Sequence, residues 1–263
     1  MSDAVMRVEE VTIRFGGVTA LDGVSFDVAR GRLTAVIGPN GAGKTSLFNC
    51  MSGVYRPTSG HIHFADADLT KVAPHKIARL GLARTFQAPS LFRGLTVVEN
   101  ILAGRYLCGR GGVLAGLLRL PHVVADEVTQ RRRAEEILSL LEIAHLRHET
   151  VDDLAYGIQK RVEFGRALAQ EPELLLLDEP MAGMTVDEKE DMSAFILTAR
   201  DQLGVTMVLV EHDMEVVMDI AEQVVVLNFG RKIADATPTE VQRDQAVIAA
   251  YLGVSRESVK EPA

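Results

Sequence analysis

The nine residues GPNGAGKTS constrain this chain more than any other part of its sequence. They follow the apolar run 33–37, which predicts a buried parallel strand, and they precede a run that predicts a helix over about 45–51. Glycines let the backbone curl so that successive N–H groups point at one anion, and the helix N-terminus faces that anion too. The pattern GxxxxGKT in this setting predicts a loop that binds the phosphates of MgATP or MgGTP. Its residues are Gly38, Pro39, Asn40, Gly41, Ala42, Gly43, Lys44, Thr45 and Ser46.

Four side chains have a chemistry that fits such a loop. The Lys44 ammonium adds a point charge to the β and γ phosphates, and the Thr45 hydroxyl is a magnesium ligand. A second motif, LLLLDEP at 174–180, ends a buried strand in two acids. Asp178 stands where a magnesium-positioning carboxylate belongs, and Glu179 can reach the water that attacks the γ-phosphate. Because strands often end in acids for solubility alone, this motif gains its meaning from the phosphate loop.

Strand and helix patterns alternate along the chain, which predicts an α/β fold with a parallel core sheet and right-handed crossovers. The β-branched stretches at 5–15 and 24–28 predict strands of a small antiparallel portion, with one more at 61–64. The stretch 74–165 is predicted to be mostly helical. Further buried strands are predicted at 174–177, 205–210 and 224–227.

Two of the predicted helices carry specific signals. Residues 124–143 form an amphipathic pattern, with Val128 and Leu138 among the apolar side chains on one side and RRR and EE opposite. The run RRR is interpreted as a solvated helix face. Thr185 and Glu188 have the spacing of a capping box, which predicts a helix that begins there and ends near Gly204.

A third motif, LAYGIQKRVEFGRAL at 154–168, points to a family when it is taken with the first two. Together they resemble the ABC transporter ATPases, whose signature loop LSxGQ opens a helix, and the resemblance spans nearly the whole chain. It implies a P-loop NTPase fold with a helical subdomain. It also implies that two ATPase subunits pair head to tail, with the signature loop closing on the ATP of the partner. The residues that would make this contact in trans are Ala155, Tyr156 and Gly157.

The resemblance implies roles for three more residues. Gln87, in ARTFQAPSLF, matches the glutamine loop, which contacts magnesium and the attacking water and senses the transmembrane partner. His212, in LVEHDM, matches the switch histidine that contacts the γ-phosphate, and Phe15 stands where an aromatic ring stacks on adenine. A phenylalanine in a short strand is, however, more often a core residue. The implied catalytic set is Glu179, His212, Lys44 and Gln87, and the implied magnesium ligands are Thr45, Gln87 and Asp178.

The sequence departs from the family pattern in two places. Ala155 replaces the usual serine of the signature loop, and Ile158 replaces the usual glutamine. Because the serine hydroxyl is a hydrogen-bond donor to the partner's γ-phosphate, we expect the closed dimer to be weakened rather than abolished. The segment AGMTVD at 182–187 stands where many relatives carry an Asp or an Asn-Pro, so communication between the two sites through it is the least secure inference.

Segments outside the catalytic motifs indicate a subfamily. The run GLARTFQAPSLFRGLTVVENILAG, the long insert before LAYG and the closing AAYLG resemble the longer-insert ATPase of branched-chain amino acid importers. Importers of urea, amides or other carboxylates share much of this pattern, and so does the ATPase of lipopolysaccharide export. A less favoured alternative is a soluble, non-transport ABC ATPase acting on DNA or the ribosome. The implied partners are transmembrane permease subunits, a second ATPase and, indirectly, a solute-binding protein.

The whole chain, residues 1–263, is predicted to be one ABC ATPase domain with four parts. These are an antiparallel portion (about 1–30 and 60–66), a P-loop core (about 31–87 and 166–235), a helical subdomain (about 88–165) and a C-terminal tail (236–263) whose last ten residues are expected to be mobile.

Composition narrows the setting in which the chain works. The formal net charge of −8 argues against a nucleic-acid partner, because basic patches supply most of that affinity. No stretch approaches the roughly 20 apolar residues of a spanning helix, and the N-terminus has no signal-peptide pattern. Cys50 and Cys108 are interpreted as reduced thiols, and His61 and His63 as surface residues. We therefore expect a peripheral protein on the cytoplasmic side of the plasma membrane.

Overall fold

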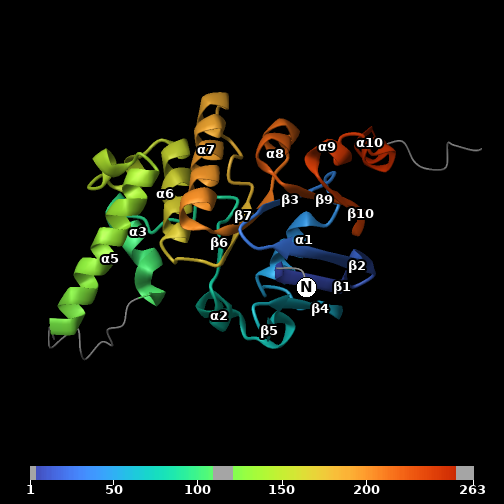
Figure 1. Cartoon of the computed structure of the whole chain (residues 1–263), viewed down its shortest axis with the longest axis horizontal. Helices are drawn as coiled ribbons and strands as arrows, with labels where there is room; N and C mark the ends of the chain where they lie inside the picture. The colour runs from blue at the N-terminus through green and yellow to red at the C-terminus, as the bar shows by residue number, and fades with distance from the viewer. Residues whose placement is uncertain (1–3, 109–120, 253–263) are drawn as a thin grey trace, which may run out of the picture. The chain divides into compact units, whose positions relative to one another are not determined.

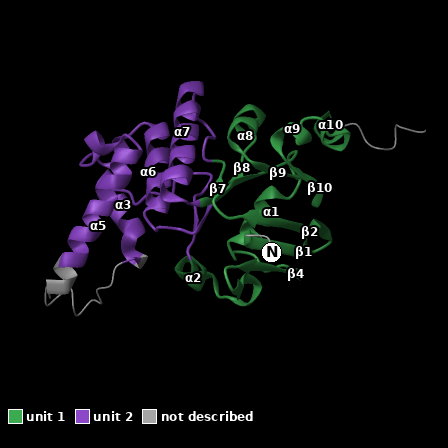
Figure 2. Ribbon diagram, in the orientation of Figure 1, with its two compact units in different colours: residues 1–80, 176–179, 206–263 green, residues 81–175, 180–205 purple. Residues whose placement is uncertain are grey.

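The computed structural model describes residues 4–108 and 121–252, which include all predicted site residues (Figure 1). The chain divides into two compact units (Figure 2). Unit 1 consists of residues 1–80, 176–179 and 206–263, and unit 2 of residues 81–175 and 180–205. The last ten residues of the predicted tail lie outside the described residues.

Unit 1 contains the predicted antiparallel sheet. Its order is β2-β1-β4-β5, formed by β1 (Ala4–Phe15), β2 (Val18–Ala29), β4 (Ser59–Phe64) and β5 (Ala67–Asp68). Val24, Phe26 and Val28 are buried on β2 while the residues between them are less so, which is the alternation expected when one face of a sheet is covered. β2 is longer than predicted, and β5 extends the sheet by a short strand.

The core sheet of unit 1 is built around β3 (Leu33–Ile37), which pairs in parallel with β8 (Thr206–Val210) and β9 (Gln223–Asn228). Every residue of β3 and β8 is buried, as their continuous apolar runs predict. An antiparallel edge strand, β10 (Arg231–Ala236), was not predicted, because its polar sequence lacks the apolar run of a buried strand. The helices of this unit include α1 (Lys44–Met51), α2 (Pro74–Ile77), α8 (Met214–Ile220), α9 (Pro238–Val241) and α10 (Gln245–Leu252).

The strand β7 (Leu174–Asp178) belongs to both units. Its last residues lie in unit 1, where β7 follows β8 in the sheet, and its first residues lie in unit 2 beside β6 (Leu82–Arg84). β6 interrupts a stretch that was predicted to be mostly helical. Its three residues are too few to show a period of two in the sequence.

Unit 2 is mainly helical. It contains α3 (Val97–Gly104), α5 (Pro121–Leu140), α6 (Tyr156–Leu168) and α7 (Val186–Leu203). A Cβ added at Gly165 of α6 would come within 2.8 Å of Ile101 on α3 and 2.7 Å of Leu141, so glycine allows these elements to pack closely. The predicted capping box of α7 is confirmed: Thr185 and Glu188 bond each other's backbone N–H, and Gly204 ends the helix with a left-handed backbone.

One prediction about the helices is wrong. Val128 was placed on the apolar side of the amphipathic helix, but it is 63% exposed, because within residues 125–140 of α5 the buried side chains begin at Ala134. The two units also divide the chain differently from the predicted parts: residues 81–87, 166–175 and 180–205, predicted as core, lie in unit 2, where α7 packs against α5 and α6.

Candidate functional site

The phosphate-binding loop between β3 and α1 requires glycine at two positions. Gly38 has φ +151°, and a Cβ there would lie 2.1 Å from the carbonyl oxygen of Leu227. Gly43 has φ +104°, and its Cβ would lie 2.6 Å from the carbonyl oxygen of Ala20. Both carbonyl oxygens belong to the backbone, so they cannot rotate away from an added Cβ as a flexible side chain could. The loop conformation is therefore available to this sequence because glycine occupies both positions.

Lys44 begins α1 and is buried with its ammonium inside the loop. Nζ donates to the carbonyl oxygen of Gly38 at 2.6 Å and to that of Pro39 at 3.1 Å. Burial lowers the pKa of Lys44, and the nearby Glu179 carboxylate opposes that shift. The N-cap, Gly43, supplies no side-chain bond to the first turn of α1. The backbone N–H groups at the start of α1 therefore receive no hydrogen bond from a capping side chain. A buried ammonium beside such a helix N-terminus attracts an anion such as phosphate.

The two acids and the histidine meet at the carboxyl ends of β7 and β8. Asp178 is the last residue of β7 and is 7% exposed, and Glu179 follows with a left-handed backbone at φ +48°. The N–H of Glu179 donates to the carbonyl oxygen of Val210 at 2.9 Å, which joins this turn to the end of β8. There, Nε2 of His212 lies 2.8 Å from Oε1 of Glu179. The acidic motif predicted Glu179 for the site and the family resemblance implied His212, but neither predicted that the two residues bond each other.

The residues predicted to hold magnesium are tested by the chemistry of their donor atoms. Thr45 is exposed at the start of α1 and offers a hydroxyl oxygen, and Asp178 offers a carboxylate. Mg²⁺ prefers oxygen ligands and takes one or two carboxylates together with substrate phosphates rather than a protein cage. In the described part of the chain, no group of three or more His, Cys, Asp or Glu could hold a metal ion. The oxygen donors of Thr45 and Asp178 suit Mg²⁺ bound jointly with a nucleotide.

Phe15, the residue predicted to stack on adenine, is not a core residue. Its side chain is 46% exposed at the end of β1 and meets Tyr55 edge-to-face, with ring centroids 5.2 Å apart. Tyr55 is 38% exposed and was missed by the sequence reasoning, because no motif spacing includes it. Two exposed aromatic rings in contact form a surface on which a planar base can stack.

The remaining predicted residues belong to unit 2 and form a group of their own. Ala155 is the N-cap of α6 and gives no side-chain cap bond, and Tyr156 follows with 41% exposure. A Cβ on Gly183 would lie 3.2 Å from the Tyr156 ring, and one on Gly157 would lie 2.2 Å from Oε1 of Glu188. The signature loop therefore lies against the segment 182–187, which leads into α7. The role of this segment in communication between the two sites was the least secure inference from the sequence.

Gln87 is exposed in the loop that follows β6. Its carbonyl oxygen accepts a hydrogen bond from Lys160 of α6 at 2.5 Å. The cluster of Lys44, Glu179 and His212 lies in unit 1, whereas Gln87 and the signature residues lie in unit 2. Lys160 was missed, although a charged side chain inside the signature motif was a visible signal.

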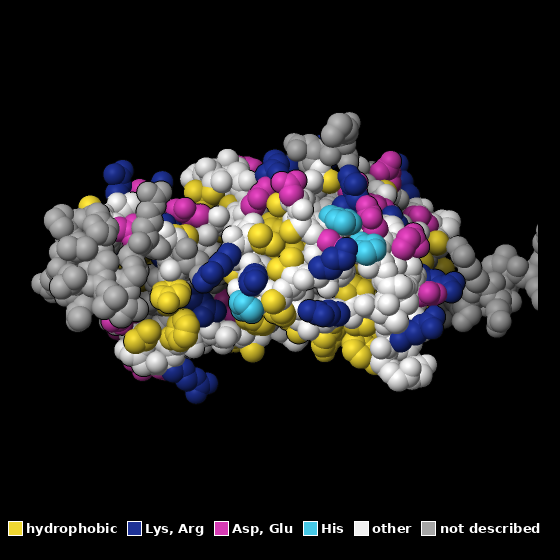
Figure 3. Space-filling view, turned by 90° about the horizontal axis from the view of Figure 1, so that it is seen from below, with side chains coloured by type: hydrophobic (Ala, Val, Ile, Leu, Met, Phe, Trp, Pro, Cys, Tyr) yellow, Lys and Arg dark blue, Asp and Glu magenta, His cyan; other side chains and the backbone are white. Residues whose placement is uncertain are grey.

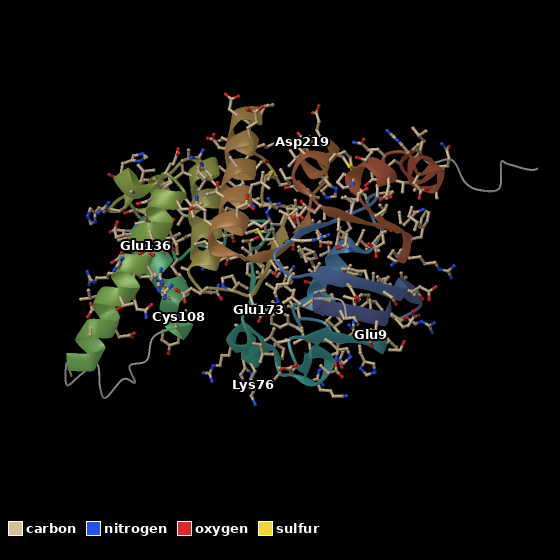
Figure 4. The ribbon with its side chains drawn as sticks, viewed as in Figure 1. Glu9, Lys76, Cys108, Glu136, Glu173 and Asp219 are labelled. Carbon is tan, nitrogen blue, oxygen red and sulfur yellow. The ribbon has the colours of Figure 1, made fainter. Side chains whose placement is uncertain are left out.

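Two charged surface features agree with the sequence interpretation. His61 is exposed and pairs with Asp68, and the half-buried His63 pairs with Glu9, which is labelled in Figure 4. The arginines of the RRR run are exposed on α5, where they pair with acids that include Glu136. On the face drawn in Figure 3, Lys and Arg side chains are interspersed with Asp and Glu. Both features are solvated surfaces. Across residues 4–108 and 121–252, no helix is long and apolar enough to cross a membrane.

Comparison with known sequences identifies two family models. The model described as ABC transporter matches residues 21–182, and the model described as branched-chain amino acid ATP-binding cassette transporter matches residues 231–257. The first match covers the phosphate loop, the signature loop and both acids.

Curated relatives align over almost their full lengths. The chain is 40% identical to the high-affinity branched-chain amino acid transport ATP-binding protein BraF of Pseudomonas aeruginosa, over 96% of this chain and 99% of that protein. It is 37% identical to the corresponding protein LivG of Escherichia coli, with the same coverage. A probable LivG of Methanocaldococcus jannaschii is 32% identical over 95% of this chain and 97% of its own length.

Solved structures lead to the same family. A nucleotide-free ATP-binding cassette from an ABC transporter superposes with a TM-score of 0.80 at 31% identity, covering 94% of this chain and 98% of that one. A cassette in its ADP conformation gives a TM-score of 0.81 at 31% identity, covering 95% and 99%. The predicted P-loop fold is thereby confirmed. The chain belongs to the ABC transporter ATPases, in the branch that includes the ATP-binding proteins of branched-chain amino acid transport.

Proposed function

We propose that this chain binds MgATP and hydrolyses it to drive an importer of branched-chain amino acids or a related small organic solute. The observation that carries the proposal is the Glu179–His212 pair, held at the strand ends of the unit that also holds the phosphate loop. The proposal for the solute rests on the relatives' names.

Each site residue of unit 1 has a role that follows from its position. Lys44 and backbone N–H groups of the phosphate loop hold the β and γ phosphates, and Phe15 stacks on the base. Thr45 and Asp178 would hold Mg²⁺, which would supply positive charge to the phosphates. Oε1 of Glu179 orients the attacking water and accepts its proton.

His212 has two partners in this account. Its Nε2 holds the Glu179 carboxylate in place, and it transfers that bond to the γ-phosphate when nucleotide is present. Catalysis is then mostly positioning and electrostatics, with Glu179 as the only group that takes up a proton.

The second ATP-binding surface comes from unit 2. Ala155, Tyr156 and Gly157 stand at the N-terminus of α6, where backbone N–H groups can meet the γ-phosphate held by a partner ATPase. Gln87 is exposed, and its side chain would serve the magnesium and water contacts that the family resemblance implies for it. Permease subunits then connect two such ATPases to the solute pathway, with the chain on the cytoplasmic side of the membrane.

The proposal is tested by co-purification from the native host. The tagged chain would be recovered from gently solubilised membranes and its companions identified by mass spectrometry. Two permease subunits, a second ATPase and an associated binding protein specific for branched-chain amino acids support the proposal. An export complex without a binding protein, or a soluble homodimer, would contradict it. A binding protein specific for urea or amides would overturn the branched-chain amino acid assignment alone.

A further inference from the structure

The loop that carries Gln87 is bound along its backbone by two charged side chains of α6. Lys160 Nζ donates to the carbonyl oxygens of Gln87 at 2.5 Å and Phe86 at 3.4 Å. Oε1 of Glu163 accepts the N–H of Ser90 at 3.0 Å and that of Phe86 at 3.4 Å. One helix therefore supplies both donors and acceptors to a single loop.

Both charged side chains are buried, at 2% exposure each. They stand three residues apart, so they lie on the same face of α6. Burial raises the pKa of Glu163, while the hydrogen bond from Ser90 and the charge of Lys160 oppose that shift. Buried charges are tolerated where partners compensate them, and here part of the compensation is the loop backbone. Release of the loop would leave two charges buried with fewer partners, so the contact favours a docked loop.

The same lysine also reaches the signature loop. Lys160 Nζ lies 5.9 Å from the ring centroid of Tyr156, within the range of a cation–π contact. Tyr156 is the first residue of α6. One ammonium group therefore contacts the backbone at Gln87 and the ring that begins the signature helix.

We propose that Lys160 and Glu163 are positioning residues that make the Gln87 loop move as one body with the N-terminus of α6. Four hydrogen bonds from two charged groups join the loop to the helix, and such bonds are stronger than neutral ones. A displacement imposed on the loop by a permease is then carried to the signature residues. This inference rests on the proposed function, from which it takes the roles of Gln87 and the signature loop.

Hydrogen exchange of the purified full-length chain tests the contact itself. Glu163→Ala removes the acceptor, so exchange in peptides covering residues 86–90 should rise at least about tenfold. Glu163→Gln retains an Oε1 acceptor and should restore most of the protection. The matched control is Arg161→Met, because Arg161 pairs with Asp191 and lies over the Phe195 ring, both on α7. Unchanged exchange at 86–90 in Glu163→Ala would overturn the proposal. If that variant does not fold, Lys160→Met takes its place with the same two outcomes.

Transport by the assembled complex tests the consequence. Lys160→Met should lower kcat for ATP hydrolysis and the solute imported per ATP severalfold, with KM for ATP within about twofold, because the phosphate loop is untouched. Arg161→Met should keep the coupling ratio. The positioning role would be overturned if Lys160→Met raised hydrogen exchange in the loop but left kcat and the solute imported per ATP unchanged. This conclusion requires that Gln87→Ala lowers both kcat and the solute imported per ATP. If Gln87→Ala impairs neither, the proposed role of Gln87 fails, and exchange alone decides whether the contact holds.

Discussion

Nε2 of His212 lies 2.8 Å from Oε1 of Glu179, although 33 positions separate them in the chain. Glu179 adopts a left-handed backbone at φ +48°, and its N–H is bound to the end of β8, from which His212 follows. The carboxylate is thus fixed through both its backbone and its side chain. A base held in this way is oriented before substrate arrives.

Glu179→Gln should leave MgATP affinity nearly unchanged and lower kcat by about a hundredfold to ten-thousandfold. The amide can still bond His212 but cannot take a proton from water. Nucleotide binding and steady-state phosphate release measure the two quantities. His212→Ala is the companion variant, because it removes the hydrogen-bond partner while retaining the carboxylate. Substantial hydrolysis by Glu179→Gln would remove Glu179 from the base role.

Gly43→Ala should unfold the phosphate loop or abolish nucleotide binding, because its Cβ would lie 2.6 Å from the carbonyl oxygen of Ala20. Gly41→Ala is the matched control, since Gly41 also has a positive φ, +79°, but no atom lies within 4 Å of the added Cβ. The control should lose only about 1–2 kcal/mol of stability, which is the cost of the left-handed backbone. Thermal unfolding with and without MgATP distinguishes the two. Equal losses would mean that backbone conformation alone matters.

Phe15→Ala should weaken ATP binding roughly five- to hundredfold, which corresponds to the loss of one base–aromatic stack. Phe15→Tyr should restore most of the affinity because it keeps the ring. Val18→Ala is the control, because Val18 is 68% exposed on the neighbouring strand and carries no ring. Titration with a fluorescent ATP analogue measures all three. Affinity unchanged in Phe15→Ala would assign the stacking role to another side chain.

Ala155→Ser should tighten the ATP-bound dimer and also stabilise the isolated chain, since Ala155 is the N-cap of α6 without a cap bond. A serine N-cap contributes about 0.5–2 kcal/mol relative to alanine. Ala155→Gly separates the two effects, because glycine is a good N-cap but supplies no hydroxyl. Unfolding curves and ATP-dependent sedimentation measure them. Dimerisation no stronger in the serine variant than in the glycine variant would rule out a hydroxyl contact.

Cys50 should resist alkylation until the chain unfolds. Burial raises its pKa from 9.0 to about 12, so near pH 8 its thiolate population falls about a thousandfold. Because the folded pKa lies above the unfolded one, its contribution to stability is complete below about pH 9 and is lost as the pH rises toward about 12. Cys108 is only half-buried and serves as the internal control in iodoacetamide labelling followed by mass spectrometry. Labelling of Cys50 at the rate of Cys108 would contradict this.

The sequence by itself determined the features that depend on neighbouring residues. The buried strands β3 and β8 follow from continuous apolar runs, and the start of α7 follows from Thr185 and Glu188, three residues apart. The phosphate loop is equally local, because its glycines and Lys44 lie within one short segment. Periods, caps and glycine turns act over a few residues, so they are visible in the chain.

Only the tertiary structure decided which distant residues meet. Glu163 binds the N–H of Ser90 across 73 positions, and among residues 125–140 of α5 the first buried side chain is that of Ala134 rather than Val128. The exposure of Phe15 likewise depends on what packs beside the end of β1. Such contacts depend on how strands and helices cross and cover one another, and no local period encodes that choice.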